Sequence, residues 1–122
     1  MTLNYLDFDY SEDTEGVGVF DAMATIGPQQ VGAVHAEIEQ VLAWAHDAFR
    51  GRRGAVGDGG EWDYDLQSMQ EVTVPEMLEF DEDTRKLRVR AGPAGAPRHT
   101  VTMAISGTPD FCAAFREQFE LG

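Results

Sequence analysis

Two adjacent runs of alternating apolar and polar residues constrain this chain more than any other feature. The apolar positions are Leu6, Phe8 and Tyr10 in the first run, and Phe20, Ala22, Ala24 and Ile26 in the second. Alternation with a period of two is typical of half-buried strands, so the two runs predict a pair of strands. The connection at residues 14–16 (TEG) fits a three-residue loop with Gly16 in the left-handed conformation.

This loop fixes which residues of the two strands lie opposite each other. Tyr10 is expected opposite Phe20, and Phe8 opposite Ala22, on the face that packs in the core. The same register places Asp9 opposite Asp21 on the other face of the sheet.

A helix is expected after the hairpin, from Pro28 to about Arg50, because proline is well tolerated at the first helical position. One stripe at helical spacing contains Val31, Val34, Ile38, Val41, Leu42, Ala45 and Phe49. Glu37 and Glu39 are expected to face away from this stripe. The glycines after Arg50 end the helix.

Four further strands and a short helix follow a glycine-rich segment at residues 51–60. In the first of these strands Trp62, Tyr64 and Leu66 are expected to face the core. The last strand carries the apolar positions Val101, Met103 and Ile105. Thr108, followed by a proline, then caps the final helix.

A second hairpin lies between these strands, with a four-residue turn at residues 82–85. The expected pairs are Phe80 with Leu87 and Leu78 with Val89 inside, and Asp81 with Lys86 and Glu79 with Arg88 outside. The segment that follows it, residues 91–99, is expected to be irregular because glycine and proline recur in it.

The resulting order is β-β-α-β-β-β-β-α in a single domain over residues 1–122. Strands and helices in this order predict an α+β fold, with a two-layer, mainly antiparallel sheet and both helices on one face.

The net charge of −13 bounds the kinds of partner. Nucleic acid and anionic membranes are disfavoured, because both require clustered lysine or arginine. A basic protein partner and simple solubility both agree with this charge. Residues 1–13 lack the features of a signal peptide, and the one cysteine, Cys112, forms no intrachain disulfide, so we expect a cytoplasmic protein in which this cysteine packs in the core.

Five aspartates are expected on the sheet face that points away from the helices. This set comprises Asp7, Asp9, Asp21, Asp63 and Asp65, with the apolar residues Tyr5, Val19 and Met23 among them. Such a face either binds a basic protein or is simply solvated. Binding of a divalent metal is a further alternative, although strand spacing rarely brings ligands together as a coordinating loop does.

The basic residues Arg52, Arg53 and Arg98 lie on or beside the two irregular segments, where they form either an anion-binding patch or ordinary solvated charge. His35, His46 and His99 lack the spacing of metal ligands. We therefore assign no catalytic residue, no cofactor and no metal ligand.

The leading hypothesis is a non-enzymatic protein-interaction module, of the adaptor, inhibitor or immunity type, that covers a basic surface. The alternatives are a divalent-metal-dependent enzyme that uses the acidic face, and a structural or assembly subunit. A homodimer is also compatible with the sequence, because pairing with a second copy protects the edges of an open sheet.

Overall fold

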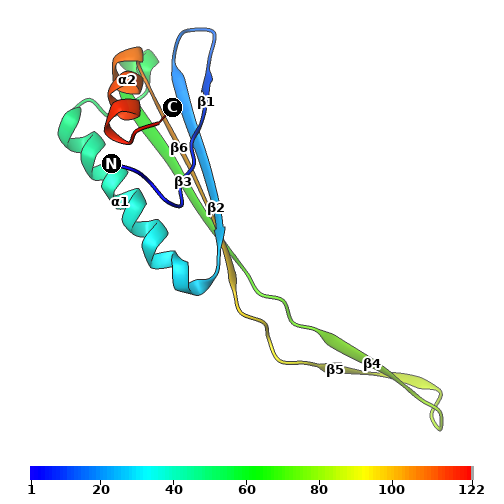
Figure 1. Cartoon of the computed structure of the whole chain (residues 1–122). Coiled ribbons are helices and arrows are strands. Elements are labelled where there is room, and N and C mark those ends of the chain that lie inside the picture. The colour runs from blue at the N-terminus through cyan, green and yellow to red at the C-terminus, as the bar shows by residue number, and fades with distance from the viewer. Residues whose placement is uncertain (122) are drawn as a thin grey trace.

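The computed structural model describes residues 1–121 and has the element order expected from the sequence (Figure 1). The elements are β1 (Asp9–Glu12), β2 (Gly18–Ile26), the 3-10 turn η1 (Pro28–Gln30), α1 (Val31–Ala48), the 3-10 turn η2 (Val56–Asp58), β3 (Trp62–Glu71), β4 (Glu76–Asp81), β5 (Lys86–Ala91), β6 (Arg98–Gly107) and α2 (Pro109–Gln118). Four strands form an antiparallel sheet in the order β1-β2-β6-β3, and β4 and β5 form a second sheet. The predicted α+β class is confirmed.

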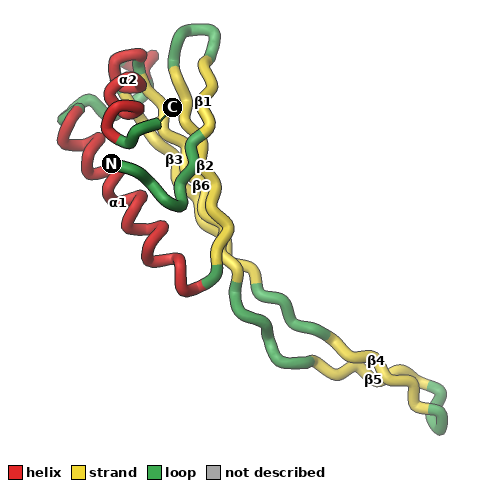
Figure 2. Tube along the Cα trace, viewed as in Figure 1, coloured by secondary structure: helices red, strands yellow, loops and turns green. Residues whose placement is uncertain are grey.

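Both helices cover the same face of the four-stranded sheet, which leaves the other face open (Figures 1 and 2). The core lies between these two layers. Its sheet side consists of alternate residues of the strands: Phe20, Ala22, Ala24, Trp62, Val101, Met103 and Ile105. Its helix side consists of residues at helical spacing: Val34, Ile38, Val41, Ala45, Phe111, Cys112 and Phe115.

The first hairpin has the predicted register, with Asp9 opposite Asp21 and Tyr10 opposite Phe20. Gly16 has a φ of +84°, the left-handed conformation that the three-residue loop requires. The strand pairing begins only at Asp9, so Phe8 lies before the ladder rather than opposite Ala22 within it. Phe8 nevertheless packs against the core.

The helix α1 buries Val34, Ile38, Val41 and Ala45 of the predicted stripe and leaves its other members half-buried, but the prediction for Glu37 was wrong. This residue is only 8% exposed and does not face solvent. Its carboxylate accepts hydrogen bonds from the backbone N–H groups of Asn4, Tyr5 and Leu6, at 2.8–3.0 Å for the shortest contact of each. The N-terminal segment therefore supplies the polar partners that burial of a carboxylate requires.

The helix α2 begins as the sequence predicts. The Thr108 side chain accepts a hydrogen bond from the Phe111 backbone N–H at 3.3 Å, and Pro109 occupies the first turn. Cys112 is buried, as expected, and burial raises the pKa of its thiol. Cys112 therefore packs in the core, where burial disfavours its thiolate form.

Beyond the helices, β3 and β6 continue into a long projection that Figure 2 shows extending away from the rest of the molecule. Pairing between β3 and β6 ends with Glu71 opposite Arg98. We call residues 72–97 the arm, and residues 1–71 and 98–121 the body. The arm contains β4 and β5, which pair only with each other.

The register of the second hairpin is confirmed, but the expected burial of its apolar pairs was wrong. Leu78 lies opposite Val89 and Phe80 opposite Leu87, as predicted. All four side chains are more than half exposed, at 56–64%. The reason is that the arm extends past both helices, so that neither of them lies over these pairs (Figure 1). Of the two expected ion pairs neither forms, and Arg88 instead contacts Asp81 diagonally.

The separation of arm and body leads to the first prediction. Replacing residues 72–97 with Asn-Gly joins two residues, Glu71 and Arg98, that already lie opposite each other, and this dipeptide suits a two-residue hairpin. We expect the free energy of unfolding of the body to change by less than about 0.5 kcal/mol, as measured by urea denaturation. A loss of several kcal/mol would contradict an independent body.

Candidate functional site

The open face of the sheet brings together three of the five predicted aspartates. Strand alternation directs Asp21 away from the core, between the buried residues Phe20 and Ala22. The register then aligns Asp9 of β1, Asp21 of β2, Ala104 of β6 and Asp65 of β3 in one row across the sheet. Adjacent strands lie about 4.8 Å apart, so this row concentrates three carboxylates within a short span.

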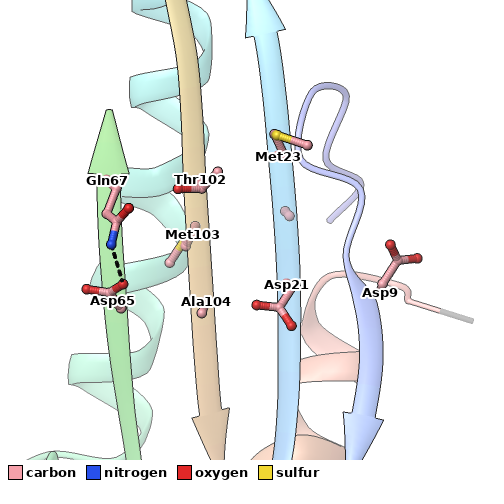
Figure 3. Close-up of a pocket in the computed structure, with 9 residues that line it drawn as sticks. Asp9, Asp21, Met23, Asp65, Gln67, Thr102, Met103 and Ala104 are labelled. Carbon is pink, nitrogen blue, oxygen red and sulfur yellow. Dashed lines mark hydrogen bonds between the residues drawn. The ribbon is translucent and has the colours of Figure 1, made fainter. Parts of the chain in front are cut away.

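A shallow depression of about 340 Å³ lies at this row (Figure 3). Its floor is the central strand β6, which presents only the short side chains of Thr102 and Ala104. Figure 3 shows Asp21 and Asp65 on the strands on either side of β6. We call the outer side chains at this depression the acidic face: Asp9, Asp21, Met23, Asp65, Gln67, Thr102 and Ala104.

The carboxylates of the acidic face lack neighbouring cations. Within residues 1–121, no ion pair involves Asp9, Asp21 or Asp65. Asp65 accepts a hydrogen bond from the side-chain amide of Gln67 at 3.2 Å, and the Asp9 carboxylate turns away from that of Asp21 (Figure 3). Like charges directly opposite each other destabilise a sheet, so the chain retains this pair at a cost in stability.

Asp63 lies on the same side of β3 but is neutralised locally. Its carboxylate is 2.9 Å from the Arg53 guanidinium and accepts a hydrogen bond from the Tyr64 backbone N–H. This backbone hydrogen bond, and then Arg53, hold the pKa of Asp63 below its usual value. Arg53 also lies over the Tyr64 ring, at 4.5 Å from its centre. Asp63 is therefore engaged within the molecule.

Asp7 and Tyr5 do not join the acidic face, because the strand alternation used to place them begins only at Asp9. Asp7 is exposed and lines a different hollow, whose lining also includes Phe119 at the C-cap of α2. The Tyr5 backbone is bound to Glu37 of α1, on the helix side. The remaining two predicted residues lie on the open face, Met23 exposed and Val19 half-buried.

The predicted cluster of arginines does not form. Arg52 pairs with Glu61 at 2.9 Å, and Arg53 pairs with Asp63 at the beginning of β3. Arg98 lies opposite Glu71 at the far end of the same strand. Nine residues of extended chain separate the two ends by about 30 Å, so the three arginines do not make one anion site.

The acidic face is not arranged as a metal centre. Among residues 1–121, no group of three or more histidine, cysteine, aspartate or glutamate side chains could hold a metal ion. His46 packs edge-on against the ring of Trp62, with ring centres 4.9 Å apart, and so serves packing. The geometry of residues 1–121 therefore gives no residue a metal-binding assignment.

One hollow was missed by sequence reasoning. An apolar depression of about 500 Å³ lies between α1 and β3, lined mainly by Ile38, Leu42, Leu66 and Val101. Leu66 was expected in the core but is 41% exposed, because the helix layer does not close over this part of β3. The apolar stripe of α1 does not indicate how far along β3 the helix layer extends.

No helix within residues 1–121 is long and apolar enough to cross a membrane. No protein-family model, curated protein or solved structure matches this chain.

Proposed function

We propose that this protein is a non-enzymatic, cytoplasmic protein-interaction module that binds a basic partner protein through the acidic face. The observation that carries this proposal is the row of Asp9, Asp21 and Asp65 on the side of the sheet that the helices leave open. An adaptor, an inhibitor and an immunity-type protein are the forms of such a module that we propose.

The charges support such a partner at two ranges. At long range, a net charge of −13 attracts a basic surface and speeds its encounter with the protein. At short range, an arginine or lysine placed between Asp9 and Asp21 relieves their mutual repulsion. Binding of such a side chain thus offsets the destabilising repulsion between the two carboxylates in the free protein.

The shape of the depression agrees with this chemistry. The small side chains Thr102 and Ala104 leave the middle of the sheet low, between the aspartates on the strands around it. A long basic side chain can lie along this floor with its charged end beside a carboxylate and its methylenes against Met23. The acidic face is therefore suited to arginine or lysine side chains rather than to a small ligand.

The second prediction tests this surface with the double substitution Asp9→Asn and Asp21→Asn. We expect the variant to lose the partner that the unmodified protein captures from a cell extract at low salt, and capture by the unmodified protein to fall steeply at 0.5 M salt, because the contact is electrostatic. The free energy of unfolding should rise by a few tenths of a kcal/mol, since the opposed charges are removed.

The matched control removes two exposed charges from the helix layer, with Glu39→Gln and Glu117→Gln. It changes the net charge by the same amount, so it should retain the partner. Equal loss in both variants would assign the effect to overall charge, and capture that ignores salt would contradict the proposal. The affinity of the purified partner, measured by calorimetry, then compares the three proteins directly.

A further inference from the structure

The arm carries the largest group of exposed apolar side chains that the fold positions in one place. Leu78, Phe80, Leu87 and Val89 are 62%, 56%, 61% and 64% exposed. They form two directly opposite pairs on one side of the β4–β5 ribbon, and we call them the apolar arm face. Contiguous exposed apolar residues of this kind mark an interaction site.

The arm also needs a cover for its own stability. An isolated two-stranded hairpin is marginally stable in water, and three or more strands or a packed layer are needed for independent stability. β4 and β5 have only each other as neighbours. A second layer on the apolar arm face supplies the missing burial.

The opposite face of the ribbon needs no such cover. It carries Glu79, Asp81, Lys86, Arg88 and Arg90, with Met77 as a single apolar residue among them. The Asp81 carboxylate contacts the Arg88 guanidinium and also accepts hydrogen bonds from the backbone N–H groups of Asp83 and Thr84. Water and the Asp81–Arg88 ion pair therefore satisfy this face, and the two faces have different roles.

Charge points to a second copy of this chain as the occupant. Residues 76–91 hold five acidic and four basic residues, whereas the rest of the chain has a net charge of −12. The arm is thus nearly neutral and extends away from the acidic body (Figure 1). Two copies that meet through their arms, with the bodies at opposite ends, keep the two large negative charges apart.

We propose that the apolar arm face docks against the same face of a second copy, antiparallel and related by a two-fold axis. Each ribbon then forms one layer of a small sandwich, with the layers about 10 Å apart. The Leu78–Val89 pair of one copy lies over the Phe80–Leu87 pair of the other, and the reverse. Such self-complementary contacts close into a dimer rather than extending into fibres.

The size of this surface sets the expected affinity. Each exposed side chain of the apolar arm face offers roughly 100 Å² for burial, so two copies remove about 800 Å² from water. Stable interfaces bury about 1,200–2,000 Å², so we expect a dimer that forms in the micromolar range and exchanges readily. The contact is apolar and the bodies repel, so added salt should strengthen it.

The third prediction tests this dimer on the full chain by sedimentation equilibrium between about 1 and 300 µM, at low and at 0.5 M salt. We expect the mass to rise from one chain toward two, and Phe80→Ser to weaken the dimer at least tenfold. The control is Met77→Ser, which alters a residue of the same strand on the opposite face and should change the constant by less than twofold. The fluorescence of Trp44 and Trp62, which both pack in the body, verifies that the body of both variants folds.

Several outcomes would overturn the dimer. They are a chain that stays monomeric throughout this range, a dimer that Phe80→Ser leaves intact, and a monomer that sediments instead with zwitterionic lipid vesicles. The sign of the salt effect separates this contact from binding at the acidic face, which salt should weaken. The variant with Asp9→Asn and Asp21→Asn should dimerise as before, so either proposal can fail alone.

Discussion

Replacing Trp62 with alanine should lower the free energy of unfolding by about 4 kcal/mol, because large-to-small changes of buried aromatic residues leave a cavity. Trp62 is fully buried at the beginning of β3. Its ring stacks on Phe111 of α2, at 5.8 Å between ring centres and 5° between planes, and also contacts His46 of α1. The side chain thus joins the sheet to both helices.

The matched control for this change is Leu66→Ala, four residues further along the same strand and on the same side. Leu66 is 41% exposed, so we expect a loss of about 1 kcal/mol or less. Urea denaturation followed by circular dichroism measures both variants without relying on the tryptophan that is removed. Similar losses at the two positions would contradict a core centred on Trp62.

Replacing Glu37 with alanine should cost about 3 kcal/mol, because three backbone N–H groups lose their acceptor. These groups belong to Asn4, Tyr5 and Leu6, and Leu6 itself is buried. No other element pairs with this segment as a strand, since the sheet begins at Asp9. The carboxylate therefore holds the N-terminal segment against α1.

Amide hydrogen exchange locates this effect. In the Glu37→Ala variant the amides of residues 4–6 should exchange much faster. The exchange rates of the β6 amides should change only as far as the global free energy of unfolding changes. Glu39→Ala removes an exposed carboxylate from the same helix and should change stability by less than about 0.5 kcal/mol. Unchanged protection of residues 4–6 in the Glu37 variant would refute the role given to its carboxylate.

The sequence alone predicted the body of this fold well, because its signals are local. Alternation located β1 and β2, and the loop with Gly16 fixed their register. The Thr108 cap marked the beginning of α2. Glu37 was misplaced because its partners lie more than 30 residues away, and a helical pattern alone does not reveal a buried polar contact.

The arm shows why correct pairing does not imply correct burial. The turn at residues 82–85 and the pairs Leu78–Val89 and Phe80–Leu87 follow from the sequence. Alternation tells which residues share a face, but not whether another layer covers that face. The extent of the helices decides this, and it depends on tertiary geometry.

The candidate site was predicted to a similar degree. Asp9, Asp21 and Asp65 lie together because strand parity and register are local properties of regular strands. Asp7 fell outside because it precedes the strand, and Asp63 was neutralised by a loop residue, Arg53. We predicted one patch of arginines because all three lie on or beside loops in the sequence. This position does not determine the distances between them in the folded chain.

The position of β6 bears on the order in which the chain can fold. β6 lies between β2 and β3, although it is the last strand in the sequence. Its pairing with β3 is the continuation of the arm hairpin and can close progressively from the turn. The pairing of β6 with β2 brings Ile26 opposite His99, which lies far away in the sequence. Forming this pairing therefore has a large cost in loop-closure entropy. During synthesis, β1, β2 and α1 are made first, but the sheet cannot be completed until the final quarter of the chain, which contains β6, has been made.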